Sequence, residues 1–247
     1  MEQFIEINTD QMDNPAVGSN LFSNRIAVAE MQQSSGIPEV SIIIQAYNRL
    51  DKTKRCAESV LAYTDGVDYD LILLDNGSED ATLEYFQTIP HKKKTVVHIT
   101  KNLGAAFPAS TLSLNKLGRF ICILQNDLIV TPHWMENLLV CMKSDERIGM
   151  VNPVCCNTSN LQCVDLPYTN YQEMKEKAAQ FNRSDPRKWE DRQRLITLGT
   201  LYRKEALMAV VIGAVVFAAP FVEFGGISSM MTLFQNIMSA SPELAGR

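Results

Sequence analysis

Two apolar runs of the chain end at an aspartate, and these two carboxylates are the groups best placed for chemistry. Leu71–Leu74 leads directly into Asp75, and Phe120–Leu124 is followed by a Gln-Asn-Asp step that ends at Asp127. If both runs are buried parallel strands, both acids lie at the carboxyl edge of the sheet, where open α/β folds bind ligands. We expect the two side chains to converge there on one nucleotide diphosphate with its divalent cation.

The segment after the first of these runs combines an acid with a tight turn. Asp75 can accept hydrogen bonds from ribose hydroxyls or from a base N–H. The following Asn76-Gly77 step permits a positive φ and a close backbone approach. The alternative interpretation is a simple turn with a helix cap, for which Ser78 and Asp80 would suffice.

The second acid is the candidate metal ligand. A hard divalent cation that keeps some of its waters needs only one or two carboxylates in addition to diphosphate oxygens. Asp127 fits this role, and its neighbour Asn126 is a candidate nucleotide contact; the alternative is an ordinary turn at a strand end. His133 could also bind metal or phosphate, although a lone histidine is more often structural.

Two further loops supply polar and small residues at comparable positions. The first is Ala46-Tyr47-Asn48-Arg49, in which tyrosine can stack on a base and asparagine can hydrogen-bond to it. The second contains Asn102 and Gly104, whose small size would let phosphate or ribose approach a helix N-terminus. Either loop alone could be an ordinary connection, but their recurrence after successive strands favours one shared site.

Strand-like and helix-like segments alternate between residues 38 and 153, which predicts an α/β fold with a mostly parallel central sheet. The predicted strands are Val40–Ile44, Leu71–Leu74, Thr95–Ile99, Phe120–Leu124 and Ile148–Val151. The predicted helices are Asp51–Thr64, Glu79–Thr88 after an N-cap at Ser78, one from the loop at 101–104 to Gly118, Pro132–Lys143 after an N-cap at Thr131, and Tyr171–Asn182.

The chain divides into three parts by pattern. Residues 1–37 are predicted to be an N-terminal extension with one short helix near Asn24–Gln33, residues 38–153 the nucleotide-binding half, and residues 154–247 the acceptor-side half. The last part contains an uncharged run of 17 residues, Ala206–Val222. A spanning helix needs about 20 residues, so this run is short for one and could equally be a buried helix and strand; membrane insertion and, more readily, peripheral membrane contact are the alternatives.

Composition narrows the class of protein. The 247 residues carry a net charge of −5, which argues against a nucleic-acid partner. Acidity does not exclude a phosphorylated ligand, because a bound cation supplies positive charge locally. The six cysteines form no C-x-x-C pair and the N-terminus has no secretory pattern, so we expect reduced thiols in a cytoplasmic protein.

Four segments, in order, resemble the family 2 glycosyltransferases of the GT-A type. The matching segments are Val40–Arg49, Leu73–Thr82, Asn102–Ala106 and Leu124–Trp134. The resemblance implies a Rossmann-type three-layer sandwich and a metal-dependent enzyme using Mn²⁺ or Mg²⁺. It also implies a nucleotide-sugar donor, for which we expect a uridine diphosphate sugar, and transfer to an acceptor hydroxyl with inversion. A lipid-linked or polysaccharide acceptor would suit the apolar run.

Carried over by position, the resemblance assigns roles to single residues. Tyr47, Asn48 and Asp75 would hold the nucleoside, Asn102 and Gly104 would line its pocket, and Asp127 would ligate the metal. One departure is that the first acid of the family's D-x-D pattern is Gln125 here.

The catalytic base is the weakest part of the match. Ser228 and Ser229 stand where the family has acids, and neither is a competent base near neutral pH. Glu223 is the predicted base because it is the sole acid between Glu205 and Glu243, with Glu190 and Asp191 as alternatives. The missing acids also motivate a second hypothesis, a catalytically degenerate protein that binds a nucleotide or sugar or acts as a scaffold. A sugar nucleotidyltransferase is disfavoured because residues 45–49 contain no glycine for a triphosphate loop.

Overall fold

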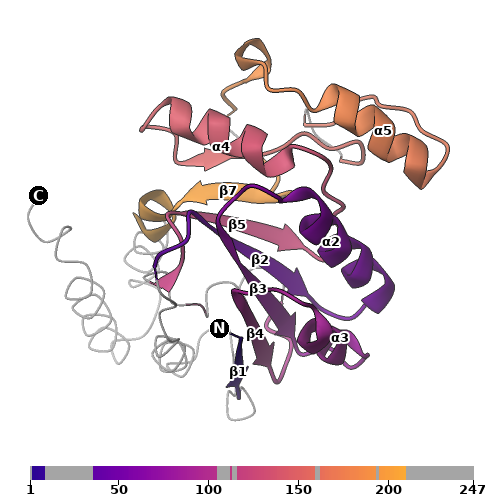
Figure 1. Cartoon of the computed structure of the whole chain (residues 1–247), viewed down its shortest axis with the longest axis vertical. Coiled ribbons are helices and arrows are strands. Elements are labelled where there is room, and N and C mark those ends of the chain that lie inside the picture. Colours follow the sequence, from indigo (N-terminus) through magenta and orange to yellow (C-terminus); the bar gives the residue numbers. More distant parts are fainter. Residues whose placement is uncertain are drawn as a thin grey trace, which may run out of the picture.

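The computed structural model describes residues 2–8, 36–104, 112, 116–158, 162–192 and 195–209. These residues build one seven-stranded sheet in the order β1-β4-β3-β2-β5-β7-β6 (Figure 1). The strands are β1 Gln3–Ile7, β2 Val40–Ala46, β3 Tyr69–Asn76, β4 Lys94–Ile99, β5 Phe120–Gln125, β6 Met150–Val151 and β7 Thr200–Arg203. The first five run parallel, and β7 is antiparallel to both β5 and β6. The predicted mostly parallel α/β fold is therefore confirmed.

The central strand β2 is apolar because both of its faces are covered. All seven of its residues are buried. Ile42 and Ile44 belong to one core cluster, while Ile43 belongs to the cluster on the opposite face. A continuous apolar run is the pattern expected of a strand that is buried on both sides.

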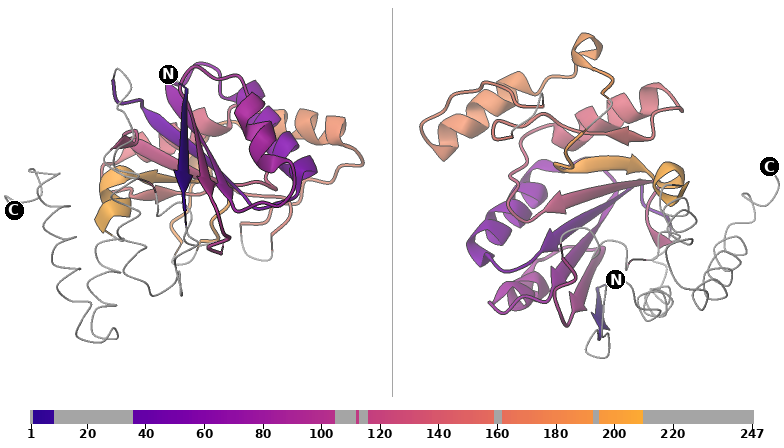
Figure 2. Two further views of the ribbon diagram at one scale, coloured as in Figure 1. Left: turned by 90° about the horizontal axis from the view of Figure 1, so that it is seen from below. Right: turned by 180° about the vertical axis from the view of Figure 1, so that it is seen from behind.

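Helices cover one face of the sheet, and loops with a short helical segment cover the other. The helices are α2 Leu50–Tyr63, α3 Thr82–Thr88, α4 Trp134–Ser144, α5 Tyr171–Phe181 and the 3₁₀ turn η3 Pro186–Lys188. Cys56, Phe86 and Leu138 bring α2, α3 and α4 into the first cluster, and Figures 1 and 2 show α2 and α3 side by side on that face. On the second face, Leu103 and Leu117 pack into the cluster around Ile43. These layers position the carboxyl ends of β2 to β5 at one edge.

The strand β1 lies within the segment that we predicted to be an extension. It pairs in parallel with β4, and Ile5 and Ile7 face the second core cluster. A five-residue strand with alternating exposure is too short a pattern to separate from loop in the sequence. The predicted helix near Asn24–Gln33 lies outside the described residues, and the domain boundaries stay predictions.

Two helices begin later than predicted. α3 begins at Thr82 rather than at Glu79, and α4 begins at Trp134 rather than at Pro132. The N-cap of α4 is His133, in the left-handed conformation with φ 64°. The expected cap of α3, Ser78, instead accepts a hydrogen bond from a neighbouring loop, as described below.

A helical turn follows β7 directly. Residues 204–209 are helical, while the rest of the apolar run 206–222 lies outside the described residues. Within the part of the chain that the structure describes, helices are too short or too polar to cross a bilayer.

Candidate functional site

The loop between β2 and α2 has an unusual backbone that a neighbouring side chain stabilises. Asn48 and Arg49 are consecutive non-glycine residues with φ of 54° and 61°. The amide of Asn126, just past β5, donates 2.9 Å hydrogen bonds to the Asn48 carbonyl and to the Thr53 hydroxyl. Because left-handed residues are costly unless their surroundings hold them, Asn126 is a positioning residue for this loop.

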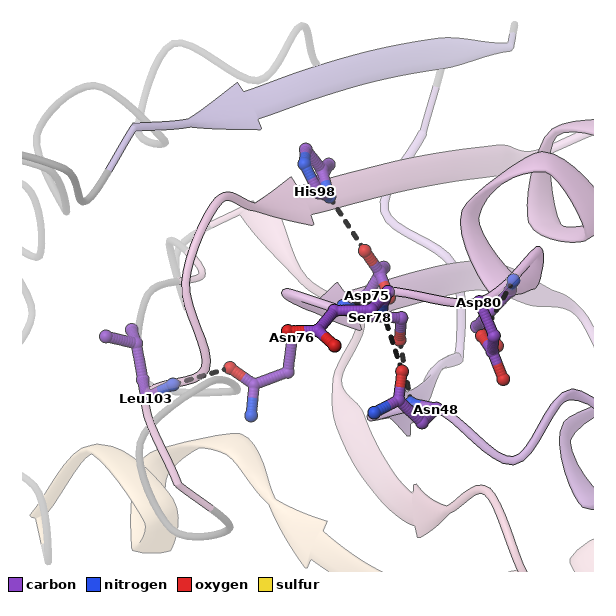
Figure 3. Close-up of polar contacts among 9 residues, drawn as sticks. Asn48, Asp75, Asn76, Ser78, Asp80, His98 and Leu103 are labelled. Carbon is purple, nitrogen blue, oxygen red and sulfur yellow. Dashed lines mark hydrogen bonds and ion pairs between the residues drawn. The ribbon is translucent and has the colours of Figure 1, made fainter.

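The same loop is tied to the turn after β3 (Figure 3). The Asn48 N–H donates to the Ser78 hydroxyl at 2.8 Å, and the Asn48 side-chain oxygen accepts from the Glu79 N–H at 2.8 Å. The Asp80 carboxylate accepts from the N–H of Leu50, the first residue of α2, at 3.0 Å. Asp80 therefore caps α2 from another loop, and its other oxygen accepts from the N–H of Thr82, the first residue of α3, at 3.1 Å.

Asp75 is fully buried, and both of its carboxylate oxygens are engaged. One oxygen accepts from the Ser78 N–H at 3.2 Å, and the other lies 2.7 Å from Nδ1 of His98 on β4. The exposed fraction of the side chain is 0% for Asp75 and 17% for His98. The sequence analysis missed His98, because the pattern of residues 95–99 indicated only a strand.

Asn76 points to the opposite face from Asp75 and holds the loop after β4. Its side-chain oxygen accepts from the Leu103 N–H at 2.9 Å, and its amide donates to Asn102 and to the Gly104 carbonyl. Gly77 lets this loop approach closely, since a Cβ there would lie 2.6 Å from the backbone nitrogen of Asn102. The side chains of Asn76 and Asn102 thus join the ends of two strands.

The exposed groups at this edge are fewer than the sequence predicts. Tyr47 is 43% exposed, and the side chains of Arg49 and Asp127 are 62% and 45% exposed. Arg49 and Asp127 face each other at 4.0 Å, so each can still bind a ligand. Asp75 lies next to the last residue of β3, and Asp127 follows β5. Because β3 and β5 flank β2, about two strand spacings, or roughly 10 Å, separate the two positions along the edge.

The acids available here suit a cation that arrives with a diphosphate. Among the described residues, no cluster of three or more His, Cys, Asp or Glu side chains could hold a metal ion. The exposed carboxylate of Asp127 suits a magnesium-like ion whose other ligands are phosphate oxygens and water. Gln125, in place of the family's first acid, contributes its backbone carbonyl to the Leu128 N–H.

The thiol nearest this edge is not a nucleophile. Cys56 donates to the carbonyl of Gln125 at 3.6 Å. Burial, with a smaller effect of the Asp127 carboxylate, raises the pKa of Cys56 to about 12. A raised pKa favours the protonated thiol near neutral pH, which is the weaker nucleophile.

The alternative bases Glu190 and Asp191 lie in the segment between η3 and β7. Glu190 pairs with Arg192 at the surface. Burial and, second, the charge of Asp191 raise the pKa of Cys141 on α4. The predicted base Glu223 and the serines Ser228 and Ser229 lie outside the described residues.

Comparisons with known proteins agree with this architecture. The family model for glycosyl transferase family 2 matches residues 41–209. The succinoglycan biosynthesis protein ExoO of Rhizobium meliloti is 28% identical over 103 residues, which are 42% of this chain and 29% of ExoO. An uncharacterized protein of Sinorhizobium fredii, y4gI, is 30% identical over 112 residues, 42% of this chain and 12% of that protein. The chain thus covers less than a third of each of these relatives.

One similar solved structure is a mannosyltransferase from Pyrobaculum calidifontis, PcManGT, in complex with GDP-Man and Mn²⁺. It is 17% identical, with a TM-score of 0.42 over 55% of this chain and 44% of that chain. The family match rests on the model instead, which spans more than half of the chain and includes all four strand-end loops. The chain therefore belongs to glycosyl transferase family 2, as the resemblance of those loops predicted.

Proposed function

We propose that this chain is a glycosyltransferase that moves a sugar from a uridine diphosphate sugar to an acceptor hydroxyl. The observation that carries the proposal is the group of exposed side chains Tyr47, Arg49 and Asp127 at the carboxyl edge of the sheet. Hydrogen bonds between the loops hold the backbone beneath them, so the group is ordered before a ligand binds. Such preorganisation reduces the free energy lost when the ligand is fixed.

Each exposed group suits one part of the donor. Tyr47 stacks on the base, and the guanidinium of Arg49 binds diphosphate oxygens. Asp127 holds Mn²⁺ or Mg²⁺ together with the diphosphate, and the ion, when bound, supplies positive charge against the leaving group. The remaining predicted residues support nucleotide binding indirectly. The loop contacts described above come from Asn48, Asn76, Asn102 and Asn126, and small side chains that leave room for the nucleotide come from Ala46 and Gly104.

Inverting transfer needs one more group, a carboxylate that takes the proton of the attacking hydroxyl. Glu223 remains the predicted base for this step. A carbohydrate or lipid-linked acceptor, as in polysaccharide biosynthesis, completes the proposal, together with a cytoplasmic location and peripheral membrane contact.

Turnover assays of the full chain test this function. With Mn²⁺ and a panel of nucleotide sugars, we expect release of nucleoside diphosphate, and Asp127→Asn should lower that rate about 100-fold or more. The matched control is Glu146→Gln, an exposed acid after α4 at the opposite edge of the sheet, which should retain the rate. Absence of turnover with every donor, while nucleotides still raise the melting temperature, would favour the degenerate binding protein instead.

A further inference from the structure

At the carboxyl edge of the sheet, Asp75 is paired with His98, so an imidazole rather than a carboxylate is exposed at this position. The two residues are register partners on β3 and β4, and their side chains lie on the same face of the sheet. Asp75 is sealed from solvent, whereas His98 keeps an exposed fraction at the end of its strand. Of the two side chains, that of His98 is therefore the one with surface exposed to a ligand, while Asp75 contacts it from the neighbouring strand (Figure 3).

The contact with Asp75 determines which hydrogen-bonding role His98 can offer. A carboxylate only accepts hydrogen bonds, so the 2.7 Å contact requires the proton on Nδ1 of the imidazole. In the neutral ring, Nε2 then carries a lone pair and acts as an acceptor. Asp75 cannot rotate freely, because its other oxygen is held by the N–H of Ser78.

In the neutral ring, Nε2 of His98 is the nitrogen that remains for a ligand. Its register partner on the outer side is Glu6 of β1, an exposed acid. Within the described part of the chain, Glu6 forms no ion pair with His98, and Nε2 has no hydrogen-bond partner. Glu6 and Asp75 are the carboxylates on the strands either side of His98, and Asp75 alone contacts it.

We propose that His98 reads the nucleobase by accepting a ring N–H at Nε2, with Asp75 as the positioning residue that fixes the tautomer. This inference rests on the proposed nucleotide-sugar function. Uracil, thymine and guanine carry a ring N–H beside a carbonyl, whereas cytosine and adenine have an acceptor nitrogen at that position. His98 therefore selects the first group against the second.

Matched nucleotide pairs test the proposal by isothermal titration calorimetry in the presence of Mg²⁺. UDP carries a ring N–H where CDP carries an acceptor nitrogen, and GDP and ADP differ in the same way among the purines. Within the pair that the unmodified chain prefers, we expect the nucleotide with the ring N–H to bind about tenfold more tightly than the nucleotide without it. One gains a hydrogen bond to Nε2, and the other places an acceptor against an acceptor. In His98→Ala the ratio within that pair should fall to about one, because the N–H member loses its hydrogen bond and the other member loses the mismatch.

The control histidine is His91, which precedes β4 at the opposite end of the strand. Its ring stacks on Tyr69 with centroids 4.6 Å apart, so His91→Ala removes a comparable ring far from the site. This variant should keep the nucleotide ratio of the unmodified chain, even if its melting temperature falls.

Asp75→Asn provides a readout that a purely structural role would not produce. The asparagine oxygen would accept from the Ser78 N–H, so its amide would face His98 and donate to Nδ1. The proton would then move to Nε2, which becomes a donor suited to cytosine. We expect the preference to shift toward CDP in this variant.

The outcomes separate the inference from the function on which it rests. If the unmodified chain binds no nucleoside diphosphate, the proposed function fails. If it binds both members of its preferred pair equally, or if His98→Ala keeps the original ratio, nucleotide binding stands and the assignment of His98 is overturned. A nucleotide ratio unchanged by Asp75→Asn would likewise refute the tautomer argument.

Discussion

Replacing Asp70 with asparagine should stabilise the fold above pH 6 and leave its stability nearly unchanged around pH 4. Asp70 lies on β3 beside Ser41 of β2, far from the strand ends that form the site. Its Oδ1 atom is buried without a hydrogen-bond partner in the described part of the chain. A charged oxygen in that position lacks both water and a donor, which disfavours the ionised form.

The size of the effect follows from the pKa. Burial, opposed in part by the Ser41 hydroxyl, raises the pKa of Asp70 from 3.8 to about 6. Between these values the folded protein binds a proton that the unfolded chain releases, so the free energy of unfolding falls as pH rises. At roughly 1.4 kcal/mol per pH unit, the loss reaches about 3 kcal/mol by pH 7. Asparagine does not ionise, so Asp70→Asn should recover about 2–3 kcal/mol there.

Urea unfolding, followed by tryptophan fluorescence at several pH values from 4 to 8, measures the difference between the variant and the unmodified chain. The control is Asp68→Asn, an acid two residues away that is 60% exposed and paired with Lys93; its difference should stay small at every pH. A stability difference for Asp70→Asn that does not change with pH, or a variant that is less stable at pH 8, would refute the reasoning.

Three other substitutions test the contacts that organise the sheet edge and its support. Gly77→Ala should lower the free energy of unfolding by about 2–4 kcal/mol, because the added Cβ would meet the backbone at Asn102. Gly66→Ala is the control: its φ is 84° but the space around it is open, so it should cost about 1 kcal/mol in the same urea assay. Lys94→Met should cost about 2–4 kcal/mol in a circular-dichroism urea titration, because the buried Lys94 ammonium donates to three carbonyls at the end of α3. Asn126→Ala should weaken UDP binding about tenfold in calorimetry while costing only about 1–2 kcal/mol of stability, since it releases the left-handed loop; unchanged binding would contradict its positioning role.

The central strands and their carboxyl edge could be predicted because burial on both faces leaves a clear apolar pattern. β2, β3 and β5 all contain their predicted cores, and the acid-bearing loops lie at one edge. The short strand β1 could not be predicted, because Ile5 and Ile7 are buried only when the segment pairs with β4. Pairing between distant segments leaves no local signal in a single sequence.

The roles of polar residues at strand ends were harder to predict than their positions. Asp75 and Asn76 are adjacent, but alternate side chains of a strand point to opposite faces. Asp75 therefore contacts His98 while Asn76 contacts the loop at Leu103. Residue type alone does not show whether a side-chain oxygen already accepts a hydrogen bond from another loop. A residue that holds a loop and a residue that binds a ligand therefore cannot be told apart in the sequence.

Many polar residues of the site face inward because they serve as hydrogen-bond partners for the loops. Parallel strands that end at one edge leave backbone N–H groups in every following loop, and buried groups of this kind require partners. Asn48, Asn126 and Asp80 provide those partners at the loop after β2. The side chains that remain for a ligand, such as Arg49 and Asp127, are held in place by that network. Substitutions of the network residues should therefore change both stability and nucleotide affinity, whereas substitutions of the exposed residues should change nucleotide affinity alone.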